Sequence, residues 1–180
     1  MKVDKKEKIL NSAIRIFSAR GYDQATMDEI ALDANVSKGL LFFYYENKEN
    51  LIIEAALKSV PIEVMNIIDS TVYLDGSGIL HDLGIKFLNY YSSKDIRNLF
   101  LYTVSNKNKY PVLKEKLKDL CFTSFDNIFS RVEKMADMKL SLAKKRSFFG
   151  SLLCYLIWWD ENDQSIEEYV TELVEGFLSY

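Results

Sequence analysis

The sequence predicts an all-α protein in which a small N-terminal head precedes a larger helical body, with about nine helices in total. The chain of 180 residues is long enough to bury a core, and its 48% hydrophobic and 27% charged residues are typical of a globular protein. It holds only 7 glycines and 2 prolines, fewer than the turns of a many-stranded fold require. Hydrophobic residues recur at helical spacing almost throughout, which favours helices over strands.

The first helix of the head carries one apolar stripe and should end at Gly21, because glycine suits the position that follows a helix. The stripe consists of Ile9, Leu10, Ala13, Ile14 and Phe17.

Capping residues place three further helices, the first two of them in the head. Thr26-Met-Asp-Glu29 is a capping box, and the helix that it starts should end near Ala34-Asn35. Ser37 is expected to cap a third helix that runs to about Tyr44. Asn47 is expected to cap a fourth.

The body reads as a series of longer helices. Its breaks fall at Asp75-Gly76-Ser77-Gly78, at Ser92-Ser93 and at Tyr110-Pro111. A second capping box, Ser165-Ile-Glu-Glu168, starts the last helix. The expected helices span residues 62–73, 79–92, 95–106, 111–137, 141–159 and 166–178.

The composition excludes several classes of protein. His81 is the only histidine, so a catalytic triad or a zinc site built on several histidines has no basis, and we expect no catalytic site, metal or cofactor. The longest apolar run, Leu152–Trp159, is too short to span a membrane. Two isolated cysteines, Cys121 and Cys154, fit a reducing cytoplasm, where we expect the protein to reside.

Residues 26–45 follow the plan of a helix-turn-helix. Ile30, Val36 and Leu41 are spaced to share a small core, and the second helix of such a motif lies in the major groove of DNA. Residues 1–50 hold eight basic and eight acidic residues, so any DNA-binding surface must be a local patch on a neutral head. The candidate DNA contacts are Thr26, Met27, Ser37, Lys38, Gly39, Leu40, Phe42, Tyr44 and Lys48.

The full stretch is more specific than the motif. Its segments Gly21-Tyr22, Thr26-Met-Asp-Glu-Ile30-Ala31, Ala34-Asn-Val-Ser-Lys-Gly-Leu-Leu41 and Phe42-Phe-Tyr-Tyr45-Glu-Asn-Lys48-Glu-Asn-Leu51 resemble the N-terminal domain of TetR-family transcriptional regulators. The resemblance covers about residues 5–60. It implies a three-helix DNA-binding head at residues 1–47, a helical effector-binding and dimerisation domain at 48–180, and a homodimer formed largely by the last two helices.

The second helix of the motif departs from the family pattern by carrying fewer polar groups. Leu40 stands where threonine is frequent, and Phe42 where tyrosine is frequent. We therefore expect fewer hydrogen bonds to bases and more reliance on phosphate contacts and DNA shape. Phe43 and Tyr45 could equally belong to the core of the head.

Aromatic residues of the body favour a mostly apolar effector cavity, although each ring could equally fill an ordinary core. The expected effector is a small hydrophobic or flat aromatic molecule. A long acyl chain is a further alternative. Lys144, Lys145 and Arg146 are expected at the surface. The candidate cavity residues are Phe87, Tyr90, Tyr91, Phe100, Tyr102, Phe122, Phe125 and Phe129.

The segment 148–159 is apolar on too many faces for a helix that packs on one side, which favours an isologous dimer interface shared with the last helix. A central core helix is the alternative. The candidate interface residues are Phe149, Leu152, Leu153, Leu156, Trp159, Tyr169, Leu173 and Phe177.

The leading hypothesis is thus a homodimeric repressor that a small effector releases from a palindromic operator on double-stranded DNA. One alternative is a helical small-molecule-binding protein whose head no longer reads DNA specifically. A small helical enzyme is the weakest hypothesis, because no nucleophile–base set, carboxylate pair or phosphate loop is visible.

Overall fold

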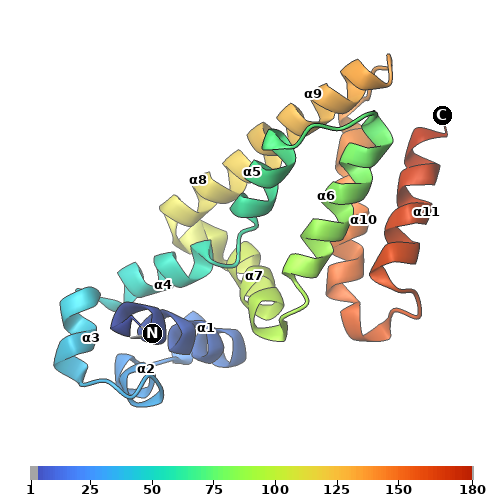
Figure 1. Ribbon diagram of the computed structural model, residues 1–180. Helices are drawn as coiled ribbons and strands as arrows, with labels where there is room; N and C mark the ends of the chain where they lie inside the picture. Colours follow the sequence, from blue (N-terminus) through green and yellow to red (C-terminus); the bar gives the residue numbers. More distant parts are fainter. Residues whose placement is uncertain (1–3, 180) are drawn as a thin grey trace. The chain divides into compact units, whose positions relative to one another are not determined.

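The computed structural model describes residues 4–179, and in that range it contains eleven α-helices and no β-strand (Figure 1). The predicted all-α class is confirmed. Within the same range, none of the helices has the length and apolar character needed to cross a membrane. The chain divides into two compact units, one containing the N-terminal segment to Val60 with residues 93–117, the other containing residues 61–92 and the chain from Lys118 onward.

The first unit, which we call the head unit, is built around its longest helix. This helix, α1 (Lys5–Gln24), packs against α2 (Met27–Asp33), α3 (Lys38–Tyr44), α4 (Lys48–Leu57) and α7 (Lys94–Asn106). A 3-10 turn (Lys107–Lys109) then leads to α8 (Pro111–Asp119). The shared core consists of fully buried apolar side chains, among them Ile9, Phe17, Ile30, Leu41, Leu51, Ala55 and Leu99.

Gly21 interrupts α1 instead of ending it. Its backbone has φ 75° and ψ 171°, outside the helical region, and a short helical stretch follows as far as Gln24. A Cβ atom at Gly21 would lie 2.6 Å from the ring of Tyr102 in α7. Glycine is therefore required here both for its backbone angles and for the close approach of α7.

The second unit, which we call the body unit, is a bundle in which α6, α10 and α11 run side by side (Figure 1). The packing of α6 against α11 is close, because a Cβ atom at Gly84 would lie 2.7 Å from Val170. Its helices are α5 (Ile62–Ser70), α6 (Gly76–Tyr90), α9 (Phe125–Met135), α10 (Leu142–Ile157) and α11 (Ile166–Leu178), with a π-helical turn (Leu120–Ser124) before α9 and a 3-10 turn (Trp159–Glu161) after α10.

Two expected helix boundaries in this unit are wrong. The helix expected at 62–73 ends at Ser70. There the Arg131 guanidinium donates hydrogen bonds to the carbonyl oxygens of Ile68 at 2.7 Å and Thr71 at 2.8 Å, in place of the amides of a further helical turn. The helix expected at 79–92 spans Gly76–Tyr90, because Asp75 caps it through its Oδ1 atom, which accepts from the amide of Gly78 at 2.8 Å. The expected helices at 95–106, 141–159 and 166–178 agree with the structure within two residues.

The single helix expected at 111–137 is also wrong, because a π-helical turn separates α8 from α9. In an unbroken helix Phe122, Phe125 and Phe129 would share one face. The wider turn changes the register, so Phe125 and Phe129 are buried while Phe122 is 50% exposed.

The domain boundary expected after residue 47 remains a prediction. By compactness alone, the head unit also takes α4 and α7.

Candidate nucleic-acid interface

The helix-turn-helix is formed by α2, a tight turn and α3. Thr26 caps α2 reciprocally with Glu29: the Thr26 hydroxyl oxygen accepts from the Glu29 amide at 3.2 Å, and the Glu29 carboxylate accepts from the Thr26 amide at 3.0 Å. This bond from the Thr26 backbone, with further bonds from its hydroxyl and from Arg20, lowers the pKa of Glu29. The capping box predicted from the sequence is confirmed.

The turn between the helices closes α2 with a Schellman motif. The amide of Val36 donates to the carbonyl of Ala31 at 3.0 Å, and the amide of Asn35 donates to that of Leu32 at 3.1 Å. Asn35 has φ 51°, in the left-handed region that asparagine tolerates better than most residues. Two backbone hydrogen bonds therefore fix the direction in which the chain enters α3.

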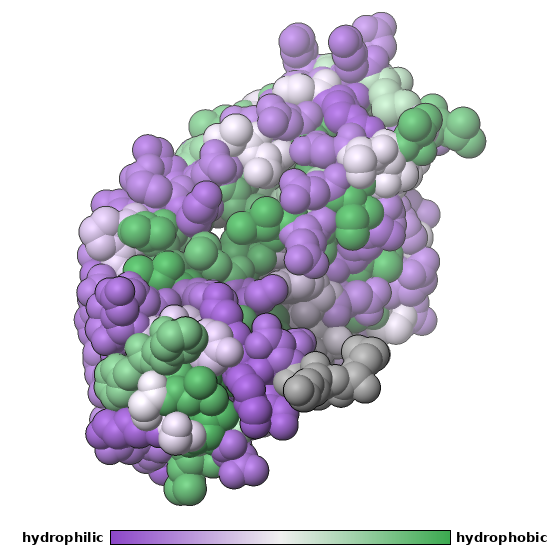
Figure 2. All heavy atoms as spheres, turned by 60° about the vertical axis from the view of Figure 1, so that its left-hand side comes forward, coloured by the Kyte–Doolittle hydropathy of each residue, from purple (hydrophilic) through white to green (hydrophobic). Residues whose placement is uncertain are grey.

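Helix α3 buries Leu41 and turns most of its remaining surface outward. Ser37 caps it, its hydroxyl oxygen accepting from the Leu40 amide at 3.2 Å. Figure 2 brings this side of the molecule forward, and apolar side chains reach its lower surface. Of the candidate DNA contacts, Thr26, Ser37, Lys38, Gly39 and Phe42 are exposed, while Met27, Leu40, Tyr44 and Lys48 are partly exposed.

The two candidate lysines are held differently. Lys38 forms an exposed ion pair with Asp28 of α2 at 2.7 Å, and solvent makes such a pair easy to exchange. Lys48 donates to the backbone carbonyl of Asp23 at 3.2 Å, which ties the start of α4 to the end of α1. Lys38 can therefore exchange Asp28 for a phosphate, whereas Lys48 stands in a fixed position at the edge of the motif.

Phe43 and Tyr45, either of which the sequence allowed in the core of the head, differ in their burial. Tyr45 is buried in the head core with 2% of its surface exposed. Phe43 is 78% exposed and packs edge-on against Tyr44, with ring centroids 5.3 Å apart. Phe43 was missed as a surface candidate, since in a run of four aromatic residues the sequence does not reveal which ring leaves the core.

Internal ion pairs engage several other cations of the head unit. Arg15 pairs with Asp33 and Arg20 with Glu29. Lys109 pairs with Asp23 at 2.8 Å, and this hydrogen bond lowers the pKa of Asp23. These pairs stabilise the arrangement of helices but reduce the positive charge that the head presents to DNA.

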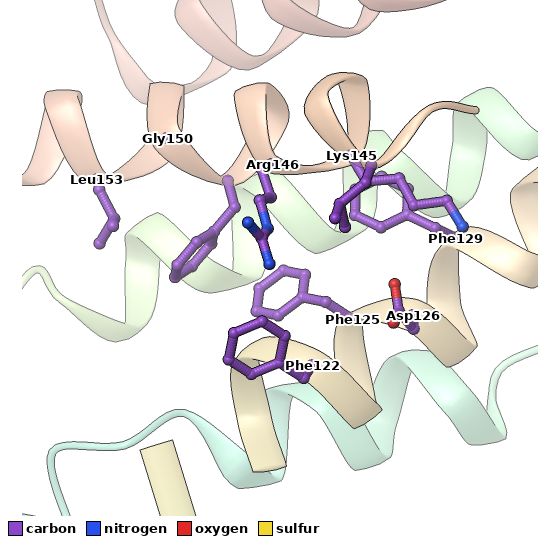
Figure 3. A pocket seen from close by; sticks show the side chains of 10 residues that line it. Phe122, Phe125, Asp126, Phe129, Lys145, Arg146, Gly150 and Leu153 are labelled. Carbon is purple, nitrogen blue, oxygen red and sulfur yellow. The ribbon is translucent and has the colours of Figure 1, made fainter. Parts of the chain in front are cut away.

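The body unit contains a pocket of about 270 Å³ between the π-turn, α9 and α10 (Figure 3). Three of the eight candidate cavity residues, Phe122, Phe125 and Phe129, line it. Two candidate interface residues, Phe149 and Leu153, line it as well. The remaining lining residues are Asp126, Leu142, Lys145, Arg146 and Gly150.

The structure does not bring the other candidate cavity residues to this pocket. Phe87 and Tyr91 are fully buried in the body core, and Tyr90 is partly exposed. Phe100 and Tyr102 belong to the head unit, where Tyr102 packs on Tyr22 with ring centroids 4.8 Å apart. The spacing of these rings in the sequence predicted apolar packing, but it did not indicate whether a ring belongs to the core of the head unit or of the body unit.

The candidate interface residues divide by exposure. Leu152, Leu156 and Phe177 are buried within the chain itself, so they support the bundle. The others are partly exposed and remain a prediction: Phe149, Leu153, Trp159, Tyr169 and Leu173.

The architecture therefore defines a helix-turn-helix protein with a second, helical unit. A family model described as "Bacterial regulatory proteins, tetR family" matches residues 9–55. The segment that forms most of α1, all of α2 and α3, and most of α4 is thus similar to the N-terminal domain of TetR-family regulators.

Curated relatives match over a stretch of similar length. The biofilm operon negative transcriptional regulator IcaR of Staphylococcus epidermidis is 44% identical over 46 residues, which are 26% of this chain and 25% of that protein. IcaR of Staphylococcus aureus strain Newman is 39% identical over 46 residues. The match spans about a quarter of the length of these relatives.

Solved structures match over nearly the whole chain at low identity, which shows a shared fold. The regulator FadR from Bacillus subtilis, in complex with stearoyl-CoA, has a TM-score of 0.73 at 18% identity and covers 97% of this chain and 98% of that one. AibR in complex with isovaleryl coenzyme A and operator DNA has a TM-score of 0.74 at 17% identity, covering 96% and 97%.

Proposed function

We propose that this protein is a homodimeric transcriptional repressor that binds a palindromic operator through α3 and leaves it when a small apolar or aromatic effector binds. The observation that carries the proposal is the geometry of the helix-turn-helix within the region that matches the TetR family. Its turn is fixed by backbone bonds, and α3 buries Leu41 while Lys38, Gly39, Phe42 and Phe43 are exposed, which supports docking of this helix in a major groove.

Binding should depend mainly on phosphate contacts, because the outward surface of α3 has few side chains that can hydrogen-bond bases. Lys48 at the start of α4 should contact a backbone phosphate, and Lys38 at the N-terminus of α3 should contact the edge of the groove. The two half-sites should be centred about one helical turn apart, roughly 34–36 Å, or a small multiple of it.

The test is fluorescence anisotropy with DNA flanking the protein's own gene, over a series of salt concentrations. Lys48→Ala should weaken binding to all sequences alike and lower the salt slope by about one. Lys38→Ala should reduce the preference for the operator over unrelated DNA. Lys114→Ala, an exposed lysine of α8, is the control and should bind like the parent. Parent-like binding by both test variants would refute this docking face.

One alternative function is a small-molecule-binding protein whose head no longer reads DNA. The internal pairing of Lys38, Arg15 and Arg20 and the apolar surface of α3 favour it. It predicts no operator preference even at low salt, together with ligand binding by the body unit.

The effector proposal rests on the aromatic pocket and on the acyl-coenzyme A ligands of FadR and AibR, two proteins of the same fold. An effector releases DNA only if it binds the DNA-free conformation more tightly, and a hundredfold preference corresponds to about 2.7 kcal/mol. Operator affinity measured with and without a ligand known to bind the body unit tests this coupling. An unchanged affinity would contradict it.

A further inference from the structure

The pocket of the body unit combines an aromatic interior with a single cation that has no acidic partner. Of the rings that line it, Phe122 belongs to the π-turn, Phe125 to α9 and Phe149 to α10. Large apolar side chains are exposed at its edge, since Phe122 is 50% exposed and Leu142 is 54% exposed. Apolar surface in a concave site favours a ligand that removes it from water.

The charges around the pocket are unevenly compensated. Lys145 pairs with Glu133 at 3.3 Å, and both side chains are largely buried, so its charge is already neutralised. Among residues 4–179, no carboxylate lies within ion-pair distance of Arg146, whose guanidinium instead lies 5.2 Å from the centroid of the Phe122 ring. Figure 3 shows this guanidinium reaching toward the rings, while Asp126 lies toward Lys145.

The π-turn is what gives the pocket its outer wall. It rotates Phe122 away from the core that Phe125 and Phe129 join, and so places its ring under Arg146. Short π-helical segments inside helices occur often at functional sites. Here the π-turn creates an arginine stacked on a half-exposed ring, an arrangement able to receive an anion beside an apolar group.

We propose that this pocket binds a small amphipathic carboxylic acid, with its carboxylate on Arg146 and its hydrocarbon part among the phenylalanine rings. A cavity of about 150 Å³ holds a benzene molecule, so 270 Å³ accommodates about ten non-hydrogen atoms. That is the size of octanoate or 3-phenylpropanoate, so the coenzyme part of an acyl-coenzyme A would have to lie outside the pocket. The inference names the effector class of the function proposed above.

The test is calorimetric titration of the full chain with octanoate, with 1-octanol as the uncharged analogue and with octanoyl-coenzyme A. Octanoate should bind most tightly. Arg146→Ala should weaken octanoate binding by about tenfold or more and leave 1-octanol binding unchanged, because only the charge-assisted bonds are lost. Arg146→Lys should restore part of the loss. Lys134→Ala, an exposed cation of α9 outside the pocket, should bind octanoate like the parent.

A second variant tests the apolar wall. Phe122→Ala should weaken octanoate and 1-octanol alike, and its unfolding temperature should stay close to the parent's because the ring is half-exposed. The proposal fails if octanoate does not bind at millimolar concentration, if Arg146→Ala binds it like the parent, or if octanoyl-coenzyme A binds more tightly. None of these outcomes depends on DNA. Failure of operator binding would therefore refute the proposed repressor but leave the proposed carboxylic-acid site unaffected.

Discussion

Gly21 and Tyr102 meet where α7 crosses the kink of α1, and any larger residue at Gly21 would be strained. With φ 75° and ψ 171°, Gly21 occupies a backbone region that is essentially restricted to glycine. Its would-be Cβ position lies 2.6 Å from the Tyr102 ring, which is itself packed against Tyr22. Backbone angles and packing thus demand the same residue for independent reasons.

Gly21→Ala should lower the free energy of unfolding by about 2–4 kcal/mol, from backbone strain and from the displacement of Tyr102. Urea unfolding followed by circular dichroism measures this change. Gly176→Ala is the matched control, because no atom lies within 4 Å of its Cβ position in α11 and alanine favours the helix. A parent-like midpoint for Gly21→Ala would show that the kink relaxes at little cost.

Tyr22 makes the stability of the head unit sensitive to alkaline pH. Its hydroxyl lies 2.6 Å from that of Thr103, which itself donates to the Leu99 carbonyl, so Tyr22 is the donor. Burial raises the pKa of Tyr22 from 10.0 to about 12. Between these values the unfolded chain loses the proton while the folded chain keeps it, so rising pH favours unfolding.

Stability should therefore fall by about 2 kcal/mol more between pH 10 and pH 12 in the parent than in Tyr22→Phe. Below pH 10 the variant should be less stable by about 1 kcal/mol, through loss of the hydrogen bond. Guanidinium unfolding of both proteins at several pH values provides the comparison. Parallel pH profiles would contradict the assignment, since other buried tyrosines titrate in both proteins.

At the scale of elements, the turn between α2 and α3 decides how the candidate recognition helix is presented. Asn35→Ala should destabilise the protein by about 1 kcal/mol, because alanine lacks the tolerance of asparagine for the left-handed region. Asn35→Gly should be neutral or stabilising. Thermal unfolding measures both effects. Asn11→Ala, in the interior of α1, should be slightly stabilising and serves as the control. Equal effects of alanine at positions 11 and 35 would contradict the role given to the turn.

The sequence predicted those elements that local chemistry determines. Thr26, Ser37, Asn47 and Ser165 cap their helices as expected, because a cap needs only one side chain and an amide two or three positions later. The end of α5 depends on Arg131, 60 residues further along the chain, and no local pattern could reveal it.

The candidate sites divide along the same line. The outward position of Lys38 follows from the motif, since α3 has one buried residue and a fixed cap. The exposure of Phe122 follows from a π-turn that the helical spacing does not reveal, so the sequence predicted that Arg146 is exposed but not that it lines a pocket beside this ring. Long-range packing thus decided what periodicity alone had left ambiguous.

At the scale of the whole molecule, the proposed function requires two heads, because a palindromic operator has two half-sites. The body unit offers a surface for pairing at the end of α10, where Ile157 and Trp158 are each 57% exposed. An isologous contact would place this surface against its own copy.

We therefore expect a dimer at micromolar concentration, and Ile157→Glu should raise its dissociation constant more than tenfold, because the interface would bury an unpaired carboxylate. Sedimentation equilibrium measures this constant. Leu74→Glu is the matched control, since Leu74 is fully exposed and lies in the segment between α5 and α6. Ile157→Glu should also weaken operator binding more than binding to unrelated DNA, because only the operator has two specific half-sites that two linked heads bind together. A monomeric parent would contradict the proposed dimer. Equal dimerisation of both variants would show that the dimer interface lies elsewhere on the body unit.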